Sequence, residues 1–363
     1  MSSVASPQGR SSVNWRRVAA FLGLSFGLAW LLELGLYLAG GLGHPGTQAV
    51  LQAVMLMPAL SALVLGMFVW RDSPLYLRTN RTVSRWFCLY YLLMTAICVA
   101  SALAGLFLSP RSTPVLAVVA PALSVIGLIL LLVLRRVGGK EAFAAVGMAG
   151  GKARYWLSFG LALGAFWGLQ TLLLALLHLG RPVNLSPMTP PGMSATMLVV
   201  LALVQGVLLG PFLGLVITFG EEYGWRGYLQ SELIKLGRVR GVALGGTIWG
   251  LWHTPVILMG YNYPGYPVLG TLLMTAFTVL LSFALAYAMF KSGGLWIAAF
   301  LHALTNQTTA TLAAVVYAPG DAIWGSSIGV LGLAFGAVVV LLILRDPLWR
   351  EKPVPAPAAG QRA

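Results

Sequence analysis

Polar side chains that could do chemistry gather in the second half of a chain that is otherwise apolar. They are Glu221 and Glu222, His253, and His302 with Asn306. An ionisable group at the middle of a membrane span costs about 2.5 to 3.5 kcal/mol or more, so such groups within apolar segments are candidate functional residues. Carboxylates and imidazoles are common general acids and bases, and an Asn amide can donate hydrogen bonds. These residues therefore suggest acid–base chemistry.

Helical spacing predicts different roles for the two glutamates. Glu222 and Arg226 are four residues apart and share one helix face, whereas Glu221 points about 100° away. Arg226 can hold Glu222 as an ion pair, which leaves Glu221 free to act as a general base. The alternative is an acidic and basic cap where a helix meets the cytoplasm.

The two histidines also have neighbours at helical spacing. Trp249 lies one turn before His253 and can pack on its imidazole. His302 and Asn306 are four apart, so both can project into one polar cavity. The structural alternatives are a histidine bonded to a carbonyl across the bundle and a hydrogen-bond clamp between helices.

Three patterns, in order, resemble those of the CAAX-processing and bacteriocin-processing family, also called type II CAAX prenyl proteases. The matching segments are Glu221-Glu222-Tyr-Gly-Trp-Arg226 for EExxxR, Trp249 to His253 for FxxxH, and His302 to Asn306 for HxxxN. Trp249 stands where the pattern has Phe, a change that keeps an aromatic ring. The resemblance covers residues 195–316, and the first five predicted spans carry no signature of the family.

This resemblance implies an intramembrane endopeptidase that hydrolyses a peptide bond of a membrane-associated or prenylated peptide or protein. The implied roles are water activation by Glu221 and His253, oxyanion stabilisation by His302 and Asn306, and support from Glu222, Arg226 and Trp249. Preorganised donors at an oxyanion typically contribute about 10²- to 10³-fold in rate. The substrate stays open, and leader peptides and bacteriocin precursors are as compatible as prenylated proteins.

Other functions have different sequence requirements. The family was long described as metalloproteases, and Glu221, His253 and His302 could bind zinc, but the lack of an HExxH pair and of a Cys ligand favours catalysis without a cofactor. A secondary transporter should show broken helices in two related halves, but the polar residues of this chain fall in one half, which disfavours that function. A serine protease is disfavoured because GxSxG with a later histidine is missing. A non-catalytic scaffold or immunity protein stays open, since fold does not fix function.

The elements that must position these residues are membrane helices. Hydrophobic residues make up 58% of the chain and charged residues 9%, with a mean hydropathy of +0.85. Apolar runs of about 20 residues match a hydrocarbon thickness of ~30 Å, so the fold class is an all-α polytopic bundle of about ten helices. The predicted spans are 18–40, 47–70, 86–108, 113–134, 155–179, 196–220, 242–260, 268–290, 295–316 and 327–344.

The basic residues predict the orientation of these spans. Of the 23 lysines and arginines, all but Arg111 and Arg181 fall on one side, which the positive-inside rule makes cytoplasmic together with both termini. The +14 charge is therefore explained by topology and anionic lipid rather than nucleic acid. We expect a cell-membrane protein with lipid and a peptide or protein substrate as partners, and an active site facing the cytoplasm. The oligomeric state stays open.

The chain is predicted to have five parts. These are disordered residues 1–15, N-terminal membrane helices in 16–180, a catalytic membrane core in 195–316, a last membrane helix at 327–344 and a disordered tail at 351–363. The sixth span is predicted to tilt or to bend at Gly210-Pro211, with its helix continuing past Glu221, because a straight helix would leave this carboxylate too shallow.

Overall fold

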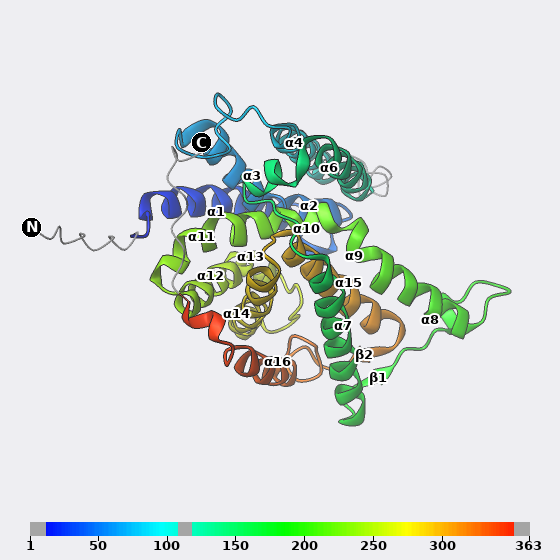
Figure 1. Cartoon of the computed structure of the whole chain (residues 1–363). Helices are drawn as coiled ribbons and strands as arrows, with labels where there is room; N and C mark the ends of the chain where they lie inside the picture. The colour runs from blue at the N-terminus through cyan, green and yellow to red at the C-terminus, as the bar shows by residue number, and fades with distance from the viewer. Residues whose placement is uncertain (1–11, 108–117, 352–363) are drawn as a thin grey trace, which may run out of the picture.

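The computed structural model describes residues 12–107 and 118–351, and this part of the chain is helical almost throughout (Figure 1). The helices of its first half are α1 (Trp15–Leu38), α2 (Thr47–Val54), α3 (Met57–Val64), α4 (Ser84–Phe107), α6 (Val119–Ala144) and α7 (Ala153–Leu176). Those of its second half are α8 (Ala195–Leu203), α9 (Gly210–Leu213), α10 (Leu215–Glu222), α11 (Gln230–Leu233), α12 (Arg238–Trp252), α13 (Thr254–Leu258), α14 (Pro267–Ser292), α15 (Trp296–Val315) and α16 (Val330–Ile343).

Seven helical segments in the described residues are long and apolar enough to cross a membrane, which makes the chain an integral membrane protein. Five correspond to the first five predicted spans, and the others are Ala195–Leu213 and α14. The predicted spans 242–260, 295–316 and 327–344 correspond to helices outside this set, namely α12 with α13, α15 and α16. The predicted count of ten and the orientation of the termini are therefore not confirmed.

Part of what the sequence predicted lies outside the described residues. This applies to Arg111 and to most of the two ends predicted as disordered, since residues 1–11 and 352–363 are not described. At the first of these boundaries, α1 begins at Trp15, whose N-cap Asn14 accepts a hydrogen bond from the Arg17 amide.

One end of the bundle carries ion pairs of basic side chains, and it is called the basic end below. Arg238, at the start of α12, lies 3.0 Å from Glu351. Lys291, near the end of α14, lies 2.6 Å from Asp346, which follows α16. Hydrogen bonds from Lys291 and from the Leu348 amide lower the pKa of Asp346 to about 2, so this pair is charged at neutral pH.

The opposite end carries a short antiparallel ladder of β1 (Gly180–Pro182) and β2 (Tyr317–Pro319). The ladder joins the segment after α7 to the segment after α15, as seen at the lower right of Figure 1. Arg181 lies within β1. Asp321, just past β2, accepts a hydrogen bond from the Tyr266 hydroxyl at 3.3 Å.

Glycines allow the helices that carry the candidate residues to pack closely on their neighbours. A Cβ added to Gly224 would lie 2.6 Å from the carbonyl carbon of Pro58 in α3, and one added to Gly246 would lie 2.7 Å from the Cα of Val279 in α14. Small residues permit such approaches where lipid provides no hydrophobic drive for association. Backbone contact thus fixes the depth of α12 and of the π-helical segment Tyr223–Leu229, which directly follows α10.

The sixth predicted span is divided rather than straight. After α8, a π-helical segment at Val204–Leu209 leads into α9, which ends at Gly214, where α10 begins. A second π-helical segment at Tyr223–Leu229 carries the helix from α10 into α11. The helix continues past Glu221 as predicted, and the interruption lies at Gly214, shortly after Gly210-Pro211. Glu221 therefore lies on a short helix distinct from the apolar span before it.

We predict that Gly224→Ala destabilises the protein by about 1 to 3 kcal/mol, since overpacking against the backbone of Pro58 forces the segment after α10 outward. Unfolding of the purified protein in detergent, followed by heat or denaturant, measures this. Gly245→Ala is the control, because the nearest atom to its added Cβ lies at 3.8 Å. Equal stability of the two variants would contradict the packing argument.

Candidate active site

A buried carboxylate on α10 connects the candidate residues to one another. Glu222 is fully buried, and its Oε1 accepts a hydrogen bond from Arg226 Nη1 at 3.0 Å. The same Oε1 lies 2.8 Å from Nδ1 of His302 on α15. Arg226 also donates from Nη2 to the Ser282 hydroxyl on α14 at 3.0 Å. The predicted pairing of Glu222 with Arg226 is confirmed, and the contacts with His302 and Ser282 extend it across three helices.

The aromatic ring of Trp249 on α12 lies at the centre of this cluster. Its indole Nε1 donates to Oε2 of Glu221 at 2.6 Å, and the Arg226 guanidinium carbon lies 4.1 Å from the ring centroid. The His302 ring meets it edge to face with centroids 5.3 Å apart. The Phe of the family pattern has no N–H group, so the departure at Trp249 supplies a hydrogen bond that orients Glu221.

His253 lies at the junction of α12 and α13, where the helix is interrupted. Its Nδ1 is 2.9 Å from the Trp249 carbonyl oxygen one turn earlier, and its ring packs edge to face on Trp252 at 4.9 Å between centroids. A carbonyl only accepts hydrogen bonds, so Nδ1 carries the proton and neutral His253 presents an unprotonated Nε2. The predicted contact with Trp249 is present, mainly through its backbone.

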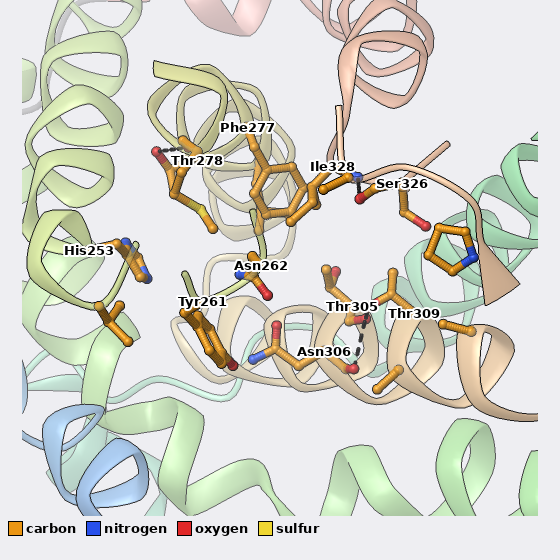
Figure 2. Close-up of a pocket in the computed structure, with 18 of the residues that line it drawn as sticks. His253, Tyr261, Asn262, Phe277, Thr278, Thr305, Asn306, Thr309, Ser326 and Ile328 are labelled. Atoms are coloured by element: carbon orange, nitrogen blue, oxygen red, sulfur yellow. Dashed lines mark hydrogen bonds between the residues drawn. The ribbon is translucent and has the colours of Figure 1, made fainter. Parts of the chain in front are cut away.

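All four predicted catalytic residues line one cavity of about 630 Å³. Glu221 and His302 are buried at its wall, whereas the Asn306 side chain is exposed to it. Figure 2 shows Asn306 extending from α15 on the side of the cavity lined by Tyr261. The structure thus brings together residues that are up to 85 positions apart in the sequence.

The cavity extends away from the basic end. Its other walls come from the second halves of α1, α7 and α15, from α2 and from two loops at the opposite end of the bundle. These loops contribute Tyr261, Asn262 and Asp321, together with residues 325–328 (Figure 2). The expectation of an active site facing the cytoplasm depends on the orientation of the bundle in the membrane, which stays a prediction.

The predicted zinc ligands do not form a metal site in this arrangement. Within the described residues, no three His, Cys, Asp or Glu side chains come together as they would to hold a metal ion. Glu221 is engaged by Trp249, and Nδ1 of His302 is engaged by Glu222. The geometry fits a hydrogen-bonded acid–base site better than a tetrahedral ligand set.

Residues 203–308 match the family model of Rce1-like type II CAAX prenyl endopeptidases. This match confirms the family resemblance seen in the three motifs, all of which lie inside it. It covers less than a third of the chain, and α1 to α7 lie before it. No curated protein and no solved structure matches the chain.

Sequence reasoning missed two residues beside the site. Ser282 gave no signal, because a serine in an apolar helix is common and only packing brings it to Arg226. Glu33 did give one. It is a carboxylate inside the first predicted span, and the structure buries it at the cavity wall.

We predict that Trp249→Phe lowers kcat/KM for peptide cleavage by about 10- to 100-fold, because a hydrogen bond to a charged group is typically worth about 1.5 to 3 kcal/mol. The ring and its packing are kept, so the thermal midpoint should shift far less than in Trp249→Ala. Kinetics on any cleaved peptide provide the measurement. Wild-type kinetics in Trp249→Phe would show that the indole N–H does not orient Glu221.

Proposed function

We propose that the chain is an intramembrane endopeptidase that hydrolyses a peptide bond of a membrane-associated or prenylated peptide by water that Glu221 and His253 activate. The observation that carries this proposal is the shared cavity, where a carboxylate from α10, an imidazole from the junction of α12 and α13, and an imidazole and an amide from α15 face one space. The match of residues 203–308 to Rce1-like endopeptidases supports the same reaction class.

Glu221 and His253 are suited to removing a proton from water. Trp249 holds one oxygen of Glu221, and no hydrogen bond is formed by the other within the described residues. His253 presents Nε2 to accept or relay a proton, since its Nδ1 is held by a carbonyl. General bases of this kind typically contribute about 10²- to 10⁴-fold in rate.

His302 and Asn306 are suited to stabilising the negative charge that develops on the carbonyl oxygen. Because Glu222 accepts a hydrogen bond from Nδ1 of His302, a doubly protonated imidazole is favoured there and can donate from Nε2. The Asn306 amide supplies a second donor from the next helical turn. Arg226 balances the charge of Glu222 and so helps to hold His302 in place.

The reaction then needs no cofactor. Water gives its proton to the Glu221–His253 pair as its oxygen attacks the carbonyl carbon. The tetrahedral intermediate collapses when the peptide C–N bond breaks, and the same proton is delivered to the leaving amine. The products are a carboxylic acid, which ionises, and a new amino terminus.

We also propose that the protein lies in the cell membrane with the basic end in the cytoplasm, as the positive-inside rule favours. The cavity is then entered from the outer side of the membrane rather than from the cytoplasm as the sequence led us to expect. The loops with Asn262 and Asp321 at the far end of the bundle support that entrance, as does the lining by the second half of α1.

We predict that Glu221→Gln abolishes processing, lowering cleavage by at least about 10²-fold, since glutamine keeps the shape but accepts no proton. Comparative proteomics of membranes from cells with the wild-type chain, with this variant and without the chain identifies the processed peptide. Glu141→Gln is the matched control, since Glu141 is exposed and lies outside the cavity. An unchanged peptide profile in Glu221→Gln would contradict general-base catalysis and favour a non-catalytic scaffold.

We predict that a cysteine at Ser326 is labelled by a membrane-impermeant maleimide in intact cells, whereas one at Ser231 is labelled only after permeabilisation. Ser326 lines the cavity at its far end, and Ser231 is exposed on α11 near the basic end. The native Cys88 and Cys98 are buried and contribute little background. The reverse pattern would place the entrance in the cytoplasm.

A further inference from the structure

Glu33 is a buried carboxylate that the proposed mechanism does not use. It lies on α1, its residue is 1% exposed, and its Oε2 has no hydrogen-bond partner. Glu33 nevertheless lines the same cavity as Glu221 and His253. A carboxylate that is buried without a partner is costly, so a residue in this state is better explained by a ligand than by packing.

The helix that carries Glu33 is fixed beside the catalytic histidine. Trp30, one turn before Glu33, donates from Nε1 to the carbonyl of Trp252 at 3.0 Å. Trp252 in turn directs its indole Nε1 to the Ser25 carbonyl at 3.4 Å. Trp252 directly precedes His253, so these two bonds hold α1 against the part of α12 that ends at the active site.

Acidic side chains prevail in the wall of the cavity, where the imidazolium proposed for His302 is already paired with Glu222. Glu33, Glu221 and Asp321 line the cavity, and among the described residues no lysine or arginine does. The Arg226 guanidinium is paired with Glu222 and does not line the cavity. A cavity with acidic walls attracts cations and repels anions.

We infer that Glu33 is a substrate-binding carboxylate that accepts an ammonium or guanidinium group of the peptide, so that the enzyme selects peptides with a basic group near the cleaved bond. This inference rests on the proposed function. Such a group provides the missing partner for Oε2 through a charge-assisted hydrogen bond. No lysine or arginine in the described lining offers a partner to a free carboxylate at the end of a substrate.

The test uses purified full-length protein in detergent and synthetic apolar peptides that differ only at one position, which is lysine, norleucine or glutamate. A further pair, with a free or an acetylated N-terminus, separates a terminal amine from a side-chain amine. Binding of fluorescein-labelled peptides is measured on the Glu221→Gln background by anisotropy, so that affinity is obtained without turnover. Cleavage is measured separately on chains with Glu221 intact.

We predict that the cationic peptide binds at least about 10-fold more tightly than its neutral analogue and that Glu33→Gln reduces this ratio to about one. Glu33→Lys should reverse the preference toward the glutamate peptide. Glu141→Gln, an exposed position, should keep the wild-type ratio. A preference that persists in Glu33→Gln, or no preference in the wild-type protein, overturns the inference.

The two proposals fail in different ways. If binding depends on Glu33 but no peptide is cleaved when Glu221 is present, the endopeptidase is overturned and the cation site stands. If peptides are cleaved without regard to charge, the cation site is overturned and the endopeptidase stands. A preference that follows the free N-terminus rather than the lysine identifies the amine that Glu33 binds.

Discussion

The site depends on one buried ion pair, between Glu222 and Arg226. Both side chains are almost completely removed from solvent, and breaking such a pair typically costs about 3 to 5 kcal/mol because a charge is left uncompensated. The pair also binds His302 on α15 and Ser282 on α14, so it ties three helices together. Every other candidate residue is positioned relative to this cluster. The ion pair therefore contributes more to the specific arrangement of the helices than to the free energy of unfolding.

Trp249 connects this buried pair to the reacting side of the site. It stacks with the guanidinium of Arg226, donates to Glu221 and offers its backbone carbonyl to His253. The same residue thus orients the two groups that are proposed to activate water. The indole N–H of Trp249 can bond only an acceptor such as the Glu221 carboxylate, and its backbone carbonyl can bond only a donor such as the His253 imidazole.

Local periodicity predicted much of this arrangement but not its long-range contacts. The pairing of Glu222 with Arg226 and the proximity of Trp249 to His253 follow from a spacing of one helical turn. The bond between Glu222 and His302, 80 positions apart, depends on how α10 and α15 pack. The count of ten spans stays a prediction, since α12 and α16 are short for a membrane crossing and apolar runs do not show where a helix ends. The side of the membrane from which the cavity opens stays a prediction, since depth along a helix does not reveal which end of a cavity is open.

The walls of the cavity and its chemistry come from different parts of the chain. Residues 203–308 supply Glu221, His253, His302 and Asn306, whereas α1, α2, α7 and the loop after β2 close the space around them. Substitutions in these outer segments alter the shape and charge of the cavity while the reacting groups keep their places. If the proposed peptidase activity holds, divergence in the range of peptides accepted can therefore proceed without any change in the three motifs, and the motifs alone do not identify the substrate.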